Sequence, residues 1–388
     1  MLVTQQRLIM VIGAMLALAI RMPFADFESQ DYVIYVAKWY DFIQAHGVFH
    51  AFRHDFYDYA PLYLHLLSIA TLIPIAKLYA IKTISVAFDF VGAYFAFRII
   101  DRTHPQSLLP AIGFVSVLLV PTAVLNGSAW GQCDMIYCSM VLAAICYSIE
   151  KRFHFAFIFF GVALSLKLQA CFVLPLFFLF WIRKECRTGY FLYLPLVYLM
   201  TIIPALLAGR HLKSLLSIYL RLAVDVPEIA INVSNVFSWI PSAQQHYAFW
   251  SHFGLALALA VIGTAFLVTY IHNRNHDLGD EMLVKLALFS TLAAPFFLPH
   301  MHDRYFFVAD IISVIYVFFS FKRLLIPLIV VANSLVAYLR YLFDVQDIDY
   351  RYTSIAVFLV LTFIFADIVG PGPREMRRSA VVADTPLA

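Results

Sequence analysis

The chain has few charged residues and no long polar segment. Only 13% of its 388 residues are Asp, Glu, Lys or Arg, and 63% are hydrophobic, whereas soluble domains usually carry about 25% charged residues. No polar stretch is long enough for a soluble domain. The formal net charge of +3 is too small to suggest a nucleic-acid partner. These features predict an integral membrane protein surrounded by the lipid bilayer.

Other common patterns are also missing. The five cysteines form no Cys-x-x-Cys pair, so we interpret them as parts of membrane helices and not as metal ligands or disulfides. The first apolar run resembles a signal peptide but has no convincing cleavage site, so we expect it to be the first spanning helix. No internal repeat is visible, which disfavours a transporter built from repeated halves.

Apolar runs long enough to cross the bilayer recur along the whole chain. A spanning helix needs about 20 apolar residues. We expect spanning helices near 7–22, 81–100, 108–125, 136–149, 153–166, 170–182, 190–208, 247–271, 283–298, 305–320, 324–340 and 353–369. The prediction is therefore an all-α bundle of about twelve transmembrane helices. It forms a single domain over residues 1–370, followed by a disordered cytoplasmic tail at 371–388.

The basic residues predict how the bundle is oriented, because Lys and Arg near helix ends are enriched on the cytoplasmic side. The run at 62–76 is short for a span and contains His65 and Pro74. If this run lies along the surface, the basic clusters fall inside, both termini are cytoplasmic, and residues 23–80 form a long extracytoplasmic loop with surface helices. If it crosses, the clusters before the tail face outward, so we prefer the first arrangement. The hairpin around Lys167 is short enough to be partly re-entrant.

Four polar segments then share the outer face. They contribute Asp26, Glu28, Asp31, Asp55, Asp58 and Tyr59 from the first loop, then Trp130, Gln132 and Asp134, then Lys167 and Gln169, and finally His300, His302, Asp303 and Arg304. Single members have simpler explanations, such as a solvated carboxylate, an interfacial tryptophan or a snorkelling lysine. The segment "HMHDRY" is harder to explain in that way, because its charges exceed what an interface anchor needs.

A carboxylate near Lys, Arg and His suggests a base that faces an anion site. Arg and Lys bind phosphate oxygens by charge-assisted hydrogen bonds, and a carboxylate can take the proton from an attacking hydroxyl. A lipid-phosphate sugar donor would suit these residues, since its lipid stays in the bilayer while its sugar reaches the aqueous pocket. We expect no metal cofactor; Mg²⁺ or Mn²⁺ at Asp26, Glu28 and Asp31 is the alternative. Zinc at His300 and His302, which are two residues apart, is disfavoured.

The four segments, in this order, resemble the GT-C superfamily of polyprenyl-phosphate-sugar glycosyltransferases. "FADFESQ" followed by "YDYAPLYLH" is similar to the "GD-aromatic-E-x-Q … DYPPLTAYH" signature of the ER α-1,3-glucosyltransferases of N-glycan assembly. "WGQCDMIY", "LKLQ" and "HMHDRY" are similar to the "GQxD", "K-x-Q" and "MHERY" motifs of bacterial mannosyltransferase-like membrane proteins. The eukaryotic enzymes have "FKQ" and "HVHEK" at the last two places. The resemblance covers residues from about 20 to 320 and implies a GT-C-like bundle.

The resemblance also implies roles for individual residues. Asp26 matches the catalytic base, and His302 matches the histidine near the donor phosphate. Arg304 stands where the eukaryotic motif has Lys, and Lys167 with Gln169 matches the "K-x-Q" pair. The chain departs from the pattern at Ala25, in place of Gly, and at Ala60, in place of Pro. It also lacks a large extracytoplasmic domain, which leaves the donor sugar and the acceptor open.

From the resemblance we expect a hexosyltransferase that moves a glucose- or mannose-type sugar from a polyprenyl-phosphate donor to a glycan or lipid-linked acceptor, by an inverting single displacement. Lys167, His302 and Arg304 are expected to hold the phosphate. The acceptor is expected at Glu28, Asp31, Asp58 and Tyr59. Sugar contact or loop ordering is expected of Trp130, Gln132, Asp134, Gln169, His300 and Asp303.

The expected location is the outer side of a cell membrane, or the ER membrane in a eukaryote. Two alternatives remain open. One is a transporter or flippase for lipid-linked sugars, and the other is a glycan polymerase or ligase.

Overall fold

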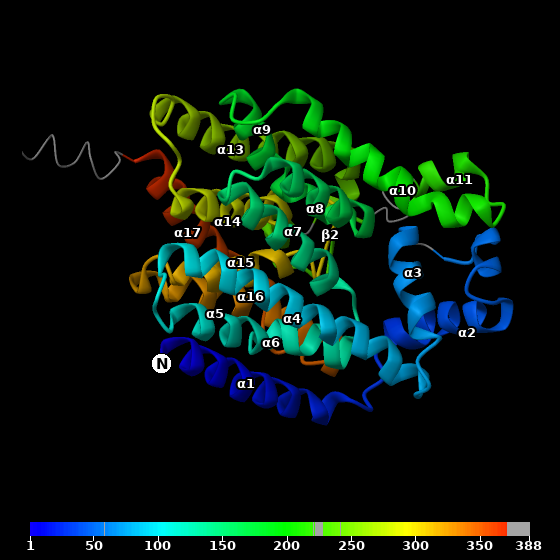
Figure 1. The fold of residues 1–388 in the computed structure, drawn as a ribbon. Helices are drawn as coiled ribbons and strands as arrows, with labels where there is room; N and C mark the ends of the chain where they lie inside the picture. Colours follow the sequence, from blue (N-terminus) through cyan, green and yellow to red (C-terminus); the bar gives the residue numbers. More distant parts are fainter. Residues whose placement is uncertain (58, 220, 222–227, 241, 371–388) are drawn as a thin grey trace, which may run out of the picture.

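The computed structural model describes residues 1–370 except 58, 220, 222–227 and 241. The predicted tail at 371–388 and the predicted acceptor residue Asp58 therefore lie outside the described residues. The described chain is built from helices and a single pair of very short strands (Figure 1). The α-helices are α1 (Leu2–Arg21), α2 (Ala37–His46), α3 (Pro61–Ala70), α4 (Lys77–Thr103), α5 (Leu109–Leu118), α6 (Pro121–Val124), α7 (Asp134–Ile149), α8 (Phe153–Leu166), α9 (Leu174–Ile182), α10 (Tyr193–Leu207), α11 (Leu212–Leu216), α13 (Tyr247–His272), α14 (Asp280–Phe297), α15 (Phe307–Val317), α16 (Leu325–Phe343) and α17 (Tyr350–Val369).

Shorter elements join these helices. β1 (Ala230–Ile231) and β2 (Met301–His302) pair in parallel. Two π-helical segments cover Tyr32–Val36 and Leu125–Trp130. The 3₁₀ segments are Met22–Phe24, His50–Arg53, Leu168–Val173, Thr188–Leu192, Val236–Trp239, Ala243–His246 and Phe321–Arg323.

The lengths and compositions of the helices confirm a multi-pass, all-α membrane protein. Six helical stretches in the described chain are long and apolar enough to cross a bilayer: Leu2–Phe24, Lys77–Thr103, Thr188–Leu207, Ala243–His272, Phe321–Phe343 and Tyr350–Val369. A seventh is possible if Leu109–Leu118 and Pro121–Trp130, which meet at a 49° bend, form one broken span. Proline at the start of the second half explains the break, because it cannot donate the backbone hydrogen bond that a continuous helix needs.

Each of the twelve apolar runs expected from the sequence contains a helix, but several of these helices are short. Asp134–Ile149, Phe153–Leu166, Leu168–Ile182 and Phe307–Val317 each have fewer residues than a full crossing requires. The short first-loop run is also helical. Its first part forms α3, which runs across the direction of α1 in Figure 1.

Contacts between distant loops group the predicted inner segments at one end of the bundle. Arg102 at the end of α4 pairs with Asp280 at the start of α14 at 3.1 Å, and Arg323 pairs with Glu281 at 2.6 Å. The N-terminus and the far end of α17 lie toward this same end in Figure 1. The helices of the first loop, α2 and α3, lie at the opposite end.

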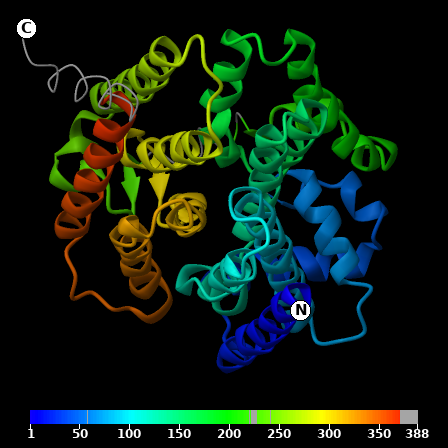
Figure 2. The same cartoon turned by 60° about the vertical axis from the view of Figure 1, so that its left-hand side comes forward.

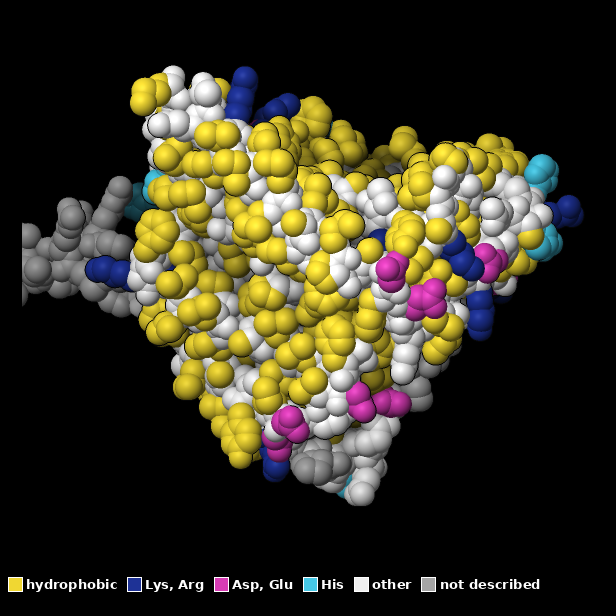
Figure 3. Space-filling view, turned by 90° about the horizontal axis from the view of Figure 1, so that it is seen from below, with side chains coloured by type: hydrophobic (Ala, Val, Ile, Leu, Met, Phe, Trp, Pro, Cys, Tyr) yellow, Lys and Arg dark blue, Asp and Glu magenta, His cyan; other side chains and the backbone are white. Residues whose placement is uncertain are grey.

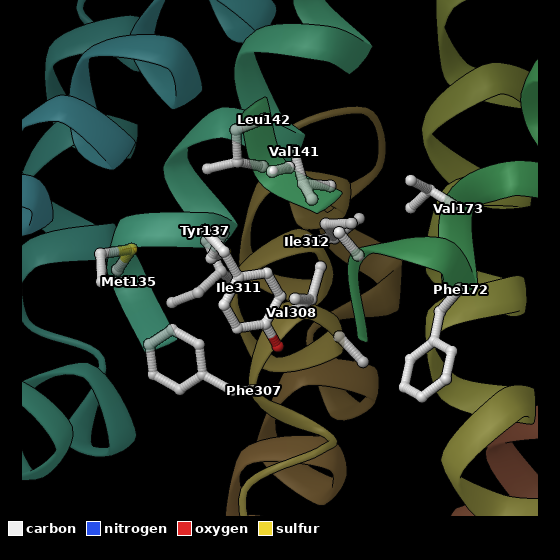
Figure 4. Packing of buried hydrophobic residues seen from close by; sticks show 14 of the residues in the cluster. Met135, Tyr137, Val141, Leu142, Phe172, Val173, Phe307, Val308, Ile311 and Ile312 are labelled. Carbon is white, nitrogen blue, oxygen red and sulfur yellow. The ribbon is translucent and has the colours of Figure 1, made fainter. Parts of the chain in front are cut away.

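The core is centred on α7, which packs against α4 and α8 and is buried along nearly its whole length. Figure 4 shows Tyr137 of α7 close to Phe307 and Val308 of α15, all of them fully or almost fully buried. Because α7 is apolar on all sides and surrounded by other helices, it is typical of a central helix in a bundle. Figure 2 shows the helices of the last third of the chain, from α14 to α17, grouped on one side and those of the first half on the other.

The outer helices carry apolar side chains on the molecular surface. Val11, Ile12, Met15 and Leu16 of α1 are all about half exposed, and Figure 3 shows a broad apolar surface with charged groups gathered at its margins. A bilayer would cover such a surface.

A buried ion pair lies beneath this apolar surface. Arg21 at the end of α1 donates two hydrogen bonds to the buried carboxylate of Asp89, at 3.1 and 2.7 Å. This pair joins α1 to α4, so Asp89 serves as a packing group between two helices.

Candidate functional site

The strand pair places the "HMHDRY" segment. Residues 301 and 302 pair with residues 230 and 231, and the backbone N–H of His300 donates to the carbonyl of Ile229 at 2.7 Å. Asn232, just after β1, lies with its amide nitrogen 3.4 Å from a carboxylate oxygen of Asp303. These contacts hold the turn between β2 and α15, in which Arg304 lies.

Arg304 stands between carboxylates from three parts of the chain. Its guanidinium nitrogens lie 3.6 Å from Asp31, 3.9 Å from Asp134 and 3.5 Å from Asp303, and its carbon lies 4.9 Å from the ring centre of Trp130. Burial acts to lower the pKa of Arg304, but the carboxylates outweigh it and hold the pKa well above its usual value. The side chain therefore stays cationic.

Two nitrogens of this guanidinium, Nε and Nη1, are buried without a hydrogen-bond partner among the described residues. They lie 3.5 Å from Asp303 and 3.9 Å from Asp134, too far or too poorly aligned for a hydrogen bond. Buried N–H groups without a hydrogen-bond partner are costly, and guanidinium donors bind phosphate oxygens by charge-assisted hydrogen bonds. Arg304 thus has unused donors at the place where the sequence predicts an anion.

Lys167 and Asp134 form the second charged pair of the site. Lys167 directly follows α8 and reaches Asp134 at the first turn of α7, where its ammonium donates to one carboxylate oxygen. The amide of Asn126 donates to the other oxygen at 2.8 Å. The side chains of the ion pair are only 9% and 1% exposed, so each charge depends on the other for compensation.

Asp31 is held by neutral donors. Trp130 Nε1, Gln132 Nε2 and Tyr341 Oη donate to its carboxylate at 2.9, 2.6 and 2.6 Å. The ring of Tyr341 also stacks on Trp130. We call Asp31, Asp134, Lys167, Asp303 and Arg304 the ion cluster. It unites four polar segments that are far apart in the sequence.

His302 and Asp303, which directly precede Arg304, have opposite pKa shifts. Burial lowers the pKa of His302 to about 4, with the positive charges of Arg304 and Lys167 acting in the same direction. Burial raises the pKa of Asp303 to about 6, although Arg304 opposes that rise. His302 is therefore neutral at pH 7 and could bind an anion only as a hydrogen-bond donor, whereas Asp303 is largely ionised.

The remaining predicted residues lie around the cluster. Gln169 hydrogen-bonds the hydroxyl of Tyr305, and its own carbonyl oxygen is buried without a partner in the described chain. His300 binds the carbonyl of Glu228 through Nδ1 at 2.9 Å, which favours its loop-ordering role. Tyr59 lies 3.3 Å from the thiol of Cys133.

Asp26 and Glu28 do not join the ion cluster. Both are exposed. Asp26 accepts a hydrogen bond from Tyr79 of α4, and among the described residues it has no hydrogen bond or ion pair with Lys167 or Arg304. The 3₁₀ segment Met22–Phe24 ends before Asp26 and the π-helical segment begins after Asp31, and residues 27–29 between the two aspartates have no regular secondary structure. The three carboxylates proposed as alternative metal ligands therefore have different partners, and no group of three His, Cys, Asp or Glu side chains in the described chain is arranged for a metal ion.

Three contributors were not anticipated. Tyr341 and Tyr338 lie in the apolar helix α16, where nothing in the sequence distinguishes them from packing residues. Tyr341 donates a hydrogen bond to Asp31, and the hydroxyl oxygen of Tyr338 accepts one from the amide of Asn126. Lys82 lies near the start of α4 and donates to backbone carbonyls of the segment that carries Asp26. The sequence feature that could have identified Lys82 is its position about one turn inside a long apolar helix, where a charged residue is usually functional.

Comparison with protein-family models and with curated proteins gives no match for this chain.

Proposed function

We propose that the protein is a membrane glycosyltransferase of the hexosyltransferase type, which uses a polyprenyl-phosphate-linked glucose or mannose as donor. Arg304 carries the proposal. A buried guanidinium with two donors that form no hydrogen bond among the described residues, close to the ion pair of Lys167 with Asp134, suits the phosphate of such a donor better than it suits a neutral ligand.

The reaction we propose is a single displacement at the anomeric carbon. An acceptor hydroxyl oxygen forms a bond to that carbon while the carbon–oxygen bond to the lipid phosphate breaks, and the bonding electrons leave with the phosphate. The carboxylate of Asp26 takes the hydroxyl proton. Lys167, Arg304 and the neutral His302 donate hydrogen bonds to the phosphate as its charge grows. Asp31 and Tyr59 orient the acceptor or the sugar.

An apolar groove near the ion cluster supports a lipid-linked donor. It has a volume of about 560 Å³ and lies between α9 and α13. Its wall includes Cys171, two residues after Gln169, and Leu298, two residues before His300, and it continues along α13 as far as Tyr270. Since helices rise 1.5 Å per residue, the wall from Leu255 to Tyr270 is roughly 22 Å long, enough for several isoprene units.

The topology that goes with this function has about twelve crossings, with the short helices near the site being partial or tilted spans. Both termini would be cytoplasmic, and the loop at 23–80 would lie outside, on a bacterial cell membrane or in the ER lumen. The reaction as written requires no metal, because lysine and arginine neutralise the phosphate.

Transfer by the purified protein tests the proposal. A panel of polyprenyl-phosphate hexoses is incubated with candidate acceptors, and products are identified by mass spectrometry for the wild type and for Asp26→Asn. We expect transfer by the wild type and its loss in Asp26→Asn, with donor binding retained. Full transfer by a folded Asp26→Asn variant contradicts the role of Asp26. Movement of an intact lipid-linked sugar across proteoliposomes, without donor consumption, supports a transporter instead.

A polymerase or ligase is distinguished by the product. Such an enzyme adds a whole oligosaccharide to the acceptor, so the acceptor mass increases by more than a single hexose.

A further inference from the structure

A second apolar groove, of about 440 Å³, lies between the end of α1 and the first half of α4. Its walls include Leu18, Met22, Val86, Ala87 and Phe90. From Tyr79 to Phe90 it follows α4 for roughly 16 Å, about half the thickness of a bilayer's hydrocarbon core. The groove therefore runs from the end of the bundle that holds the site into the membrane.

The polar end of this groove is next to Asp26. Tyr79 lines the groove and donates a hydrogen bond to the Asp26 carboxylate. Lys82 also lines it, and its ammonium donates to the carbonyls of Phe24, Ala25 and Phe27 at 2.8, 3.0 and 2.6 Å. These bonds fix the segment that carries Asp26 at the opening.

The cations at this opening are already engaged. The ammonium of Lys82 has three carbonyl partners, and Arg21 is paired with Asp89. The opening thus offers a carboxylate and a phenol, which suit hydroxyl groups, and little that suits a phosphate. In contrast, the unused donors belong to Arg304 in the ion cluster.

We propose that the groove between α1 and α4 holds the hydrocarbon chain of a glycolipid acceptor, whose sugar hydroxyl reaches Asp26. This inference rests on the proposed glycosyltransferase function and names its acceptor class. It also accounts for the separation of Asp26 from Lys167 and Arg304. In a single displacement the attacking hydroxyl and the leaving phosphate lie on opposite sides of the anomeric carbon, so the base and the phosphate donors belong on different sides of the sugar.

Photocrosslinking tests the occupant without requiring catalysis. The full-length protein in phosphatidylcholine nanodiscs is irradiated with a glucosyl diacylglycerol whose acyl chain carries a diazirine, and labelled peptides are mapped. We expect labelling of α1 and α4 that unlabelled glucosyl diacylglycerol suppresses at least fivefold and additional phosphatidylcholine does not. Labelling that is spread evenly over the exposed faces of α1, α10 and α13, or suppressed equally by phosphatidylcholine, means that the groove holds ordinary bilayer lipid and overturns the inference.

Two matched substitutions make the test specific. Ala87→Phe fills the groove, whereas Ala19→Phe adds the same ring to an exposed position of α1 outside it. We expect Ala87→Phe to lower the specific labelling at least fivefold and Ala19→Phe to leave it unchanged, with both variants monodisperse. Equal labelling in both variants contradicts the inference.

The transfer assay separates the two proposals. If hexose is transferred only to water-soluble acceptors, and Ala87→Phe has no effect on the rate, the glycosyltransferase stands and the glycolipid acceptor falls. If the specific labelling is found but no donor of the panel is consumed, the groove binds glycolipid and the glycosyltransferase proposal falls.

Discussion

The pair formed by Lys167 and Asp134 offers a quantitative test of how the site is built. The two side chains are almost fully buried, and removing one partner of a buried pair typically costs about 3–5 kcal/mol. Asp134 keeps the amide of Asn126 at 2.8 Å and the guanidinium of Arg304 at 3.9 Å. We therefore expect the lower end of that range, about 3 kcal/mol, for Lys167→Met.

A double-mutant cycle isolates the interaction between the two charges. Asp134→Asn alone leaves the lysine ammonium buried and should cost a similar amount. In Lys167→Met with Asp134→Asn neither charge remains, so the loss should be smaller than the sum of the single losses by about 2–3 kcal/mol. The free energy of unfolding is measured in mixed detergent micelles for the four proteins. Strictly additive losses would refute the assignment of a tightly coupled buried pair.

Three further predictions concern the surroundings of Arg304. Because the pKa of His302 is lowered to about 4, the unfolded chain takes up this proton first, and His302 makes the free energy of unfolding fall as the pH is lowered from 6.5 to 4. Because the pKa of Asp303 is raised to about 6, the folded chain takes up that proton first, and Asp303 makes the free energy of unfolding rise as the pH is lowered from 6 to 4. As the pH is lowered from 6.5 to 4, Asp303→Asn should therefore lose stability relative to the wild type, and His302→Gln should gain stability. Thermal unfolding measures this, and an equal dependence of stability on pH in both variants would contradict the two pKa shifts. Arg304→Lys keeps the charge but loses the planar fork, so the Kd for a polyprenyl-phosphate hexose should rise at least about tenfold, and an unchanged Kd in a binding titration would exclude bidentate contact. Tyr341→Phe removes one hydrogen bond to the Asp31 carboxylate and should lower the free energy of unfolding by about 1.5–3 kcal/mol, whereas no measurable loss would show that the bond is not formed.

Much of the site's composition could be predicted from sequence, because topology alone determines which loops meet. Once the basic residues assign the loops to two ends of the bundle, Gln132, Lys167 and Arg304 must lie at the same end, and the structure brings their segments into contact. Helix positions were predictable for a related reason, since apolar runs of sufficient length have few alternatives to helix in a bilayer.

Finer features depended on local geometry that the sequence does not express. Asp26 and Asp31 are only five positions apart, yet the irregular segment between them leaves the two carboxylates with different partners, Tyr79 and Tyr341. Tyr341 itself lies in an apolar helix, where a tyrosine is usually a packing residue, and only the crossing of α16 beside Trp130 shows its hydroxyl to be a donor to the site.

Binding of a polyprenyl phosphate to the ion cluster tests the central claim most directly. The protein is titrated in nanodiscs with undecaprenyl phosphate, and binding is followed by the ³¹P resonance of the lipid for the wild type, Arg304→Gln and the control Arg351→Gln, which alters an exposed arginine paired with Asp349. The account predicts saturable binding by the wild type and the control, and a loss of at least about tenfold in Arg304→Gln, because charge-assisted hydrogen bonds contribute about 1.5–3 kcal/mol each. Equal affinity in all three proteins would contradict the account, because the unused donors of Arg304 would then have no part in holding phosphate.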